Sequence, residues 1–242
     1  MSAPFRFKQI ISEDVSLTLV EPDIYSVYPA GASPGAYDSI GASKIYDLVA
    51  CNRFYNRLMW GYSVKSYATL CQNALASSSD GWVLDLACGS LAFTAKTYTG
   101  FSKRPVVFVD QSVKLLRKGK TRLKKLKKII PENMFFLHAD ARHLPFKANI
   151  FHTIIALNLL HCLGDVKAVL SELKRVLTVN GTSALTTLVQ SNRWSNGYLK
   201  MLARSGALIS REPEDLSAAF DDMEMQVTHE IKGNLAIFKY RL

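Results

Sequence analysis

Features that would mark a metal-binding or membrane-inserted protein are missing from this sequence. Its four cysteines form no CxxC pair and show no zinc-ligand spacing, so we expect no metal site. No apolar run reaches the roughly 18 residues that a transmembrane helix needs, and the N-terminal residues lack the compact apolar core of a secretory signal. We therefore expect a cytoplasmic protein with reduced thiols. Its 242 residues suffice for one sizeable core.

Acidic residues are absent between Gln111 and Pro131, where nine basic residues account for most of the formal net charge of +10. Small or apolar residues recur there at helical spacing, which predicts a helix over 112–130 with a buried stripe and outward lysines. The stripe consists of Ser112, Leu116, Gly119, Leu123, Leu126 and Ile130. The charged face over 114–128 is either a solvated helix surface or a contact for RNA or an anionic membrane.

Short apolar β-runs alternate with helical stretches after residue 77, and this alternation predicts a parallel sheet covered on both faces. An antiparallel hairpin over 225–242 closes the chain and brings the predicted sheet to seven strands. A β-like run over Val15–Val20 precedes these elements. The predicted strands before the hairpin are 82–86, 106–109, 134–137, 153–157 and 182–188; the predicted helices are 91–98, 112–130, 165–177 and 212–220, with a short helical turn near Leu144.

The domain organisation follows from a change in composition before residue 77. We expect an N-terminal extension over 1–42, then a helical and aromatic cap over 43–76. The main α/β domain would occupy 77–242, as a three-layer sandwich with a mostly parallel seven-stranded sheet and the C-terminal antiparallel hairpin.

The segment Val83–Thr94 carries the clearest local signal for a binding site. A buried strand ends in Asp85, and a turn of small residues then opens a helix, which places a ligand site at the carboxyl end of the sheet. A dinucleotide would need several glycines against its pyrophosphate, but this turn holds only Gly89, and Asp85 would repel phosphate. A cofactor with an amino group, a positive sulfur and no phosphate suits a carboxylate there.

Two further acids end the next two strands. Asp110 follows Val106–Val109 and could accept hydrogen bonds from both hydroxyls of a ribose, although it could also cap the helix that follows. Asp140 comes just after the third strand, where its carboxylate could bond an adenine amine and the Ala141 N–H a ring nitrogen. Three acids at the ends of three successive strands therefore point to a nucleoside.

Taken together, these motifs resemble those of the class I S-adenosylmethionine-dependent methyltransferases, especially the small-molecule branch that includes the ubiquinone and menaquinone biosynthesis enzymes. The resemblance covers about residues 43–242 and implies a Rossmann-like fold. Its matching pieces are Leu84–Ser90, Val109–Ser112, Ala139–Phe146, Leu159–Leu163 and Glu172–Gly181.

This resemblance implies that S-adenosylmethionine is the cofactor and that a small acceptor is methylated by in-line displacement. Its methionine end would lie against the turn, its ribose at Asp110 and Gln111, and its adenine at Asp140 and Ala141. Asn158 would lie beside the sulfonium. The cofactor-binding residues that the resemblance implies are Asp85, Ala87, Cys88, Gly89, Asp110, Gln111, Asp140, Ala141 and Asn158, with Tyr46 and Tyr55 in a cap over the cofactor.

The sequence departs from the family turn D-x-G-x-G-x-G at two positions. Ala87 replaces the first glycine, and Leu91 replaces the third. Because the third position starts a helix packed close to the ligand, a leucine there could narrow the pocket. Leu91 therefore leaves open a catalytically silent relative that acts as a scaffold.

Residues for the reaction itself are less well defined. His161 is the candidate for a general base by its position after the fourth strand, and it could equally be a packed structural histidine. The aromatic cap and the 190–212 segment would bind an apolar or ring-containing acceptor. That segment contributes Trp194, Tyr198, Met201 and Leu202.

Two rival enzyme classes fit the sequence less well. An RNA methyltransferase would explain the basic segment, but Ala156–Leu160 lacks the Asn/Asp-Pro-Pro-Tyr/Phe signature of enzymes that methylate exocyclic amines. A nicotinamide oxidoreductase would need the glycines that the turn lacks, and it would not need the terminal hairpin.

Overall fold

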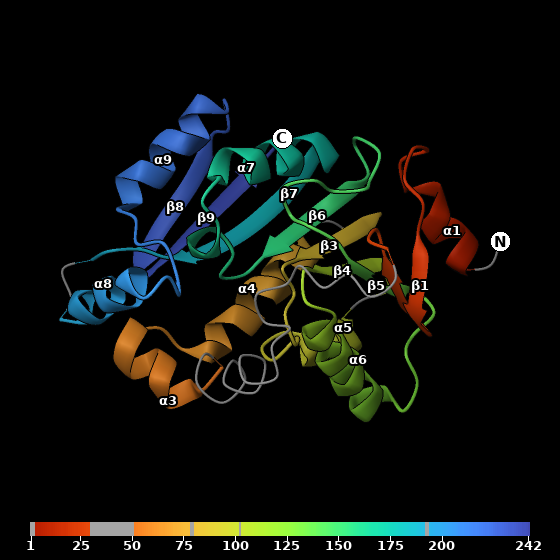
Figure 1. Ribbon diagram of the computed structural model, residues 1–242, viewed down its shortest axis with the longest axis horizontal. Coiled ribbons are helices and arrows are strands. Elements are labelled where there is room, and N and C mark those ends of the chain that lie inside the picture. The colour runs from red at the N-terminus through yellow and green to blue at the C-terminus, as the bar shows by residue number, and fades with distance from the viewer. Residues whose placement is uncertain (1–2, 30–50, 78–79, 102, 192–193) are drawn as a thin grey trace.

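The computed structural model describes residues 3–29, 51–77, 80–101, 103–191 and 194–242 (Figure 1). Within these residues, one mixed sheet has the strand order β1-β2-β5-β4-β3-β6-β7-β9-β8. The strands are β1 (Thr18–Glu21), β2 (Ile24–Ser26), β3 (Trp82–Leu86), β4 (Val106–Asp110), β5 (Met134–His138), β6 (Phe151–Ala156), β7 (Leu177–Leu188), β8 (Val227–Lys232) and β9 (Leu235–Arg241).

The α/β fold class is confirmed, and the sheet is wider than the sequence predicted. Strands β3 to β7 are parallel, and β9 and β8 close the sheet as the expected antiparallel hairpin. Two additional strands come from the N-terminal residues: β1 pairs antiparallel with β2, and β2 pairs parallel with β5. The β-like run expected over Val15–Val20 overlaps β1, but the prediction of seven strands did not include it in the sheet. It missed β2, because this strand is only three residues long and its partner Phe136 lies more than a hundred residues away.

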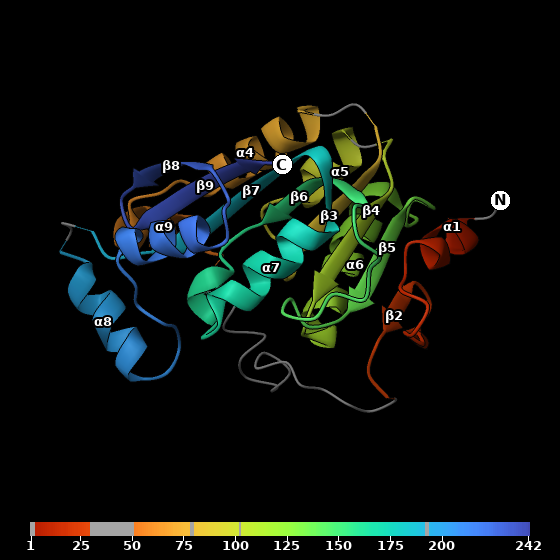
Figure 2. The same ribbon diagram turned by 90° about the horizontal axis from the view of Figure 1, so that it is seen from above.

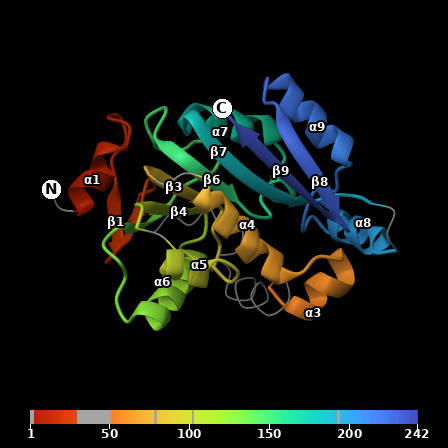
Figure 3. The same cartoon turned by 180° about the vertical axis from the view of Figure 1, so that it is seen from behind.

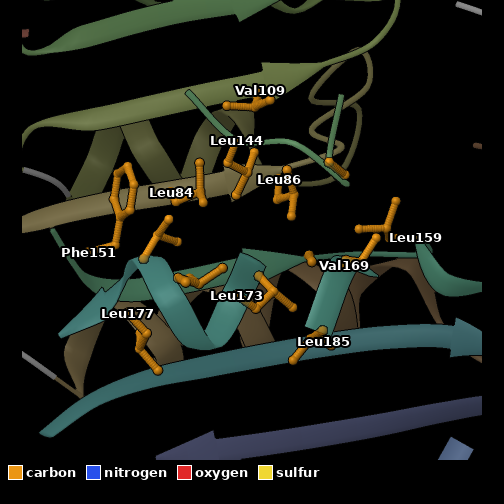
Figure 4. Close-up of a cluster of buried hydrophobic side chains, with 14 of the residues drawn as sticks. Leu84, Leu86, Val109, Leu144, Phe151, Leu159, Val169, Leu173, Leu177 and Leu185 are labelled. Atoms are coloured by element: carbon orange, nitrogen blue, oxygen red, sulfur yellow. The ribbon is translucent and has the colours of Figure 1, made fainter. Parts of the chain in front are cut away.

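The central strands form because they are apolar on both faces. All five residues of β4 and all five of β5 are buried, which is typical of a parallel sheet covered by helices on each side. Figure 4 shows part of one resulting core, where Leu84 and Leu86 from β3 face Val169 and Leu173 of helix α7. This rigid sheet fixes the positions of the residues at its carboxyl edge.

Helices cover both faces of the sheet (Figure 2). Helices α7 and α9 pack on one face, where their residues share a core with β6 and β9. Helices α4, α5 and α6 pack on the other. The helices are α1 (Ala3–Gln9), α3 (Arg53–Tyr55), the π-helix η3 (Asn56–Trp60), α4 (Val64–Ala76), α5 (Ala95–Phe101), α6 (Val113–Lys127), the 3-10 turn η4 (Leu160–Cys162), α7 (Val166–Val176), α8 (Asn196–Arg204) and α9 (Pro213–Asp222).

Three local expectations were wrong. Leu126 was assigned to the buried stripe of α6, but it is 43% exposed because the last turn of the helix extends past its packing partners. The chain near Leu144 forms a turn and not a helix. Helix α8 was not predicted; it lies with α3 at the end of the molecule opposite α1 (Figures 1 and 3).

Among the described residues, no helix combines the length and the apolar character needed to cross a membrane. None of the four cysteines, all within the described ranges, takes part in a disulfide.

Candidate functional site

A cavity of about 520 Å³ opens at the carboxyl ends of the parallel strands. The turns after β3, β4, β5 and β6 supply one part of its wall, and η3, α4 and α8 supply the other. The predicted residues that line it are Tyr55, Ala87, Gly89, Asp110, Gln111, Asp140, Ala141, Asn158, His161, Tyr198 and Leu202. These side chains from distant parts of the sequence therefore share one site.

The turn after β3 has the backbone shape of a glycine-rich loop with only one glycine. Ala87, Gly89 and Leu91 all have positive φ angles, of 54°, 56° and 55°. Such angles strain residues that carry a Cβ atom, and they are found where a backbone must approach a ligand closely. The turn thus has positive φ at all three positions where the resemblance expects glycine, although two of them carry a side chain.

Asp85 and Cys88 lie beside the cavity and do not line it. They border a smaller hollow that shares Ala87 and Asn158 with the main cavity. Asp85 is fully buried, and its Oδ2 atom has no hydrogen-bond partner in the part of the chain described. Burial, assisted by the nearby Asp110 and partly offset by the Tyr98 hydroxyl, raises the pKa of Asp85 to about 7. A buried carboxyl with an unused oxygen is suited to a cationic partner.

Leu91 leaves the main cavity open. Its side chain is 1% exposed and packs toward α6, where a Cβ atom built on Gly119 would lie 3.1 Å from the Leu91 Cγ. It borders only the smaller hollow. The lack of a side chain at Gly119 accommodates the leucine that stands in place of the third family glycine.

Asp110 is held by the backbone on both sides. The N–H of Gly89 donates to Oδ2 at 2.7 Å, and the N–H of Ser112 donates to Oδ1 at 2.8 Å. Two charge-assisted bonds of this kind fix the carboxylate. Its orientation is therefore set before any ligand arrives.

Asp140 is more heavily engaged than expected. Arg142 donates to it from its backbone N–H at 2.9 Å and from its guanidinium at 2.6 to 3.1 Å, and Gln111 Nε2 donates at 3.3 Å. Burial would raise the pKa of Asp140, but the bonds from Arg142 outweigh it and lower that pKa. The acceptor capacity of the carboxylate is largely used within the protein.

Asn158 follows β6 in a left-handed conformation, with φ of 59°, which asparagine tolerates better than most residues. The Tyr67 hydroxyl donates to its Oδ1 at 3.1 Å, and its backbone N–H donates to Thr186 Oγ1 at 2.9 Å. Tyr67 comes from α4, 91 residues away, and also lines the cavity. Sequence reasoning missed this support because nothing local links the two positions.

His161 is positioned as a hydrogen-bond donor. The backbone N–H of Leu188 donates to its Nδ1 at 3.2 Å, and Thr187 Oγ1 lies 3.1 Å from the same atom. Nδ1 is thus an acceptor, which places the proton of the neutral ring on Nε2. Burial, assisted by Arg211, lowers the pKa of His161 to about 4. A neutral ring of such low basicity is poorly suited to accept a proton.

Aromatic rings form the far end of the cavity. The Tyr55 hydroxyl donates to that of Tyr198 at 3.1 Å, and the Trp60 ring lies 5.8 Å from the Tyr198 ring. Burial, together with this hydrogen bond, raises the pKa of Tyr55. Trp194 and Met201 were expected here, but neither lines the cavity, and they are 65% and 53% exposed. They occupy the outer side of the segment around α8, and the aromatic composition of this segment does not indicate which residues face the cavity.

Asn234, in the β8–β9 turn, ties the aromatic end together. Its backbone N–H donates to the Trp60 carbonyl at 2.9 Å, and its Oδ1 accepts from Ser195 Oγ at 2.7 Å. Its Nδ2 donates to the Val189 carbonyl at 3.1 Å and to Asn196 Oδ1 at 2.8 Å. Through its backbone and its side chain, this one fully buried residue links η3, the end of β7 and the start of α8.

Tyr46 and the question of a metal site complete the comparison with the sequence. Tyr46 lies outside the described residues. Within the described ranges, no group of three or more histidine, cysteine, aspartate or glutamate side chains is arranged to hold a metal ion.

Residues 83–181 match a family model described as a methyltransferase domain. Together with the strand order and the cavity at the carboxyl ends of the strands, this match supports the resemblance of the chain to the class I S-adenosylmethionine-dependent methyltransferases.

Among known proteins, the chain is 28% identical over 155 residues to the ubiquinone/menaquinone biosynthesis C-methyltransferase UbiE of Shewanella frigidimarina. The match covers 61% of this chain and 61% of that protein, so the chain spans less than two thirds of its relative's length.

Solved structures show the same fold at low identity. Phosphoethanolamine N-methyltransferase 2 of Haemonchus contortus, in complex with S-adenosyl-L-methionine, superposes with a TM-score of 0.66 at 13% identity, covering 88% of this chain and 61% of that one. A geranyl diphosphate methyltransferase, in complex with GPP and sinefungin, gives 0.59 at 14% identity and covers 73% and 76%.

Proposed function

We propose that this chain transfers a methyl group from S-adenosylmethionine to a small apolar or aromatic acceptor. The observation that carries the proposal is the division of one cavity into two ends of different chemistry. One end holds Asp110, which is fixed by backbone N–H groups, and Asn158, which is fixed by the Tyr67 hydroxyl. The other end holds Tyr55, Trp60 and Tyr198. A cofactor and an acceptor of different polarity would fit side by side.

The residues at the polar end fit S-adenosylmethionine in charge. Asp85 offers a buried oxygen without a partner, suited to an ammonium group close to the turn of Ala87, Cys88 and Gly89. Asp110 is oriented for ribose hydroxyls, with Gln111 beside it. When bound, the cofactor would supply a methyl group activated by its positively charged sulfur.

At the adenine end we propose a changed role for Asp140. Because Arg142 and Gln111 already occupy its oxygens, Asp140 would hold those two side chains in place, and the backbone of Ala141 would contact the adenine ring. Asn158, fixed by Tyr67, would lie beside the sulfonium. The aromatic walls, including Tyr55, would exclude water from the reacting groups.

His161 would act on the acceptor as a donor rather than as a base. Its Nε2–H can hydrogen-bond an acceptor oxygen and so favour the ionised, more nucleophilic form of that group. No carboxylate, lysine or arginine is found among the described residues that line the aromatic end. An acceptor such as a phenol or quinol, which carries its own ionisable oxygen or activated ring carbon, suits this arrangement.

The test combines binding with labelled transfer. We expect calorimetry to detect S-adenosylmethionine binding by the purified chain, and methyl-labelled cofactor to label a pool of quinols or phenols. Label appearing mainly in amines or RNA would contradict the proposed acceptor. No cofactor binding at millimolar concentration would contradict the whole proposal and favour the silent scaffold.

A further inference from the structure

The exposed end of α6 carries a patch that the methyltransferase site does not use. This helix-tip patch comprises the last turn of α6 and the two residues after it: Lys124, Lys125, Leu126, Lys127, Lys128 and Ile129. All six are exposed, including the two aliphatic side chains, of which Leu126 is 43% and Ile129 71% exposed. Cations and exposed aliphatic groups therefore alternate over a short stretch.

The other cations of α6 are engaged by the protein. Arg117 pairs with Glu21 at 2.8 Å, and Lys120 lies 3.5 Å from both Glu21 and Asp23. The Arg122 guanidinium donates to Ser90 Oγ at 2.7 Å. By contrast, the four lysines of the helix-tip patch form no ion pair with any residue that the structure describes. The net charge of the segment is thus concentrated at one end of the helix.

One general physical effect, the helix dipole, accounts for only part of this pattern. Lysines near a helix C-terminus are favoured by the helix dipole, which explains some of the charge. The dipole gives no reason for Leu126 and Ile129 to face solvent between those lysines. Lysines with interspersed aliphatic side chains match the two components of an anionic lipid surface, because the charges meet headgroups while the aliphatic groups enter the interface.

We propose that the helix-tip patch binds the surface of an anionic lipid bilayer. RNA is the less suitable partner, because the patch offers no aromatic ring on which a base could stack and its aliphatic groups would remain exposed. The inference does not depend on the proposed methyl transfer.

The geometry of α6 separates the patch from the cavity. Leu115, in the first turn, lines the cavity, and Lys127 is twelve residues further along, about 18 Å away at the rise of an α-helix. A bilayer bound at the tip therefore leaves the cofactor and acceptor ends accessible. Binding to vesicles and binding of S-adenosylmethionine are expected to be independent.

The experiment is vesicle co-sedimentation of the full chain with phosphatidylcholine vesicles, with and without phosphatidylglycerol. We expect binding only to the anionic vesicles, weakened by salt. The variant K124E/K125E should bind about tenfold or more weakly, since each lysine contributes about fivefold near such a surface. The variant L126S/I129S should bind several-fold more weakly even at low salt.

Matched controls separate the patch from total charge and hydrophobicity. K65E/K200E makes the same charge change at exposed lysines of α4 and α8, and V179S removes an aliphatic side chain that is 73% exposed on β7. Both should bind like the wild type. Calorimetry with S-adenosylmethionine should give the same affinity for every variant as for the wild type.

Several outcomes would overturn the inference. Equal losses in K65E/K200E would mean that total charge alone drives binding, and an unaffected L126S/I129S would mean that the contact is purely ionic. A gel-shift affinity for RNA that exceeds vesicle binding, and that falls in K124E/K125E, would assign the patch to nucleic acid. If S-adenosylmethionine failed to bind while vesicles still did, the proposed function would fail and this inference would stand.

Discussion

The two ends of the cavity are built in opposite ways. At the cofactor end, the two carboxylates are held by groups in the turns that follow the strands, as when Gly89 and Ser112 fix Asp110. Asn158 is the exception, because it depends on Tyr67 from α4. At the acceptor end, rings from distant elements meet, and Tyr55 contacts Tyr198 across 143 residues. The first arrangement suits a ligand that does not change between related enzymes. The second can be altered residue by residue, which is how acceptor specificity would diverge on a constant scaffold.

The sharpest way to separate the two ends is to remove Asp110. We expect D110A to lower the affinity for S-adenosylmethionine by about 100-fold or more, because two buried backbone N–H groups lose a charged acceptor. Calorimetry measures this loss. Acceptor binding to the aromatic end should change little, and an equal loss of both would show that the ends are not independent.

Asn234 is the corresponding test for the acceptor end. We expect N234A to lower the free energy of unfolding by about 2 to 3 kcal/mol, because the Ser195 hydroxyl and the Val189 carbonyl lose a buried partner. Urea denaturation measures this change. In the fraction that stays folded, KM for the acceptor should rise while the dissociation constant for S-adenosylmethionine stays near the wild-type value. If N234A lowered the affinity for S-adenosylmethionine and left the KM for the acceptor unchanged, Asn234 would not support the acceptor end.

Asp85 should make both stability and cofactor binding depend on pH. Its pKa is raised to about 7 in the folded chain against an ordinary value of 3.8, so ionising it disfavours the folded state. Stability should therefore fall as pH rises from about 4 to about 7, by roughly 3 to 4 kcal/mol. Over the same range, affinity for the cationic cofactor should rise.

D85N should remove both effects, and E13Q serves as the control because the Glu13 side chain is 90% exposed. Denaturation midpoints across this pH range provide the measurement. If D85N kept the wild-type pH dependence, the buried carboxyl would not be its source.

The smallest expected effect concerns His161. If it donates a hydrogen bond and does not accept a proton, kcat at saturating cofactor should stay flat from about pH 8 to pH 5.5, above the pKa of about 4. H161Q, which keeps a donor, should retain activity within about fivefold of the wild type, with H161A falling further. A kcat that drops with a midpoint near pH 6.5 would restore the role of general base.

Much of the fold was predictable because its signals are local. The five parallel strands and the terminal hairpin follow from apolar runs and turn residues. Since the carboxyl ends of parallel strands meet at one edge, the convergence of Asp110, Asp140 and Asn158 on one cavity also follows.

What the sequence did not predict depends on contacts between distant residues. The link from Tyr67 to Asn158 and the bonds of Asn234 join elements that have no local relation. Leu126 has the helical spacing of a buried residue, but periodicity does not indicate where the packing partner ends. Asp85 borders the smaller hollow and not the main cavity, and its position along the strand does not indicate how deeply the turn covers it.

The short β1–β2 pair also protects one edge of the sheet against pairing with strands of other molecules. Without β2, the strand β5 would form the edge of the sheet, and its unpaired backbone N–H and C=O groups could pair with a strand of another molecule. Instead, the sheet ends on one side at β1, a four-residue strand with an irregular register between Leu19 and Glu21. On the other side it ends at β8, which carries the charged pair Glu230 and Lys232. Neither border is a good template for strand addition, so crowding should not drive these molecules to polymerise through their sheets.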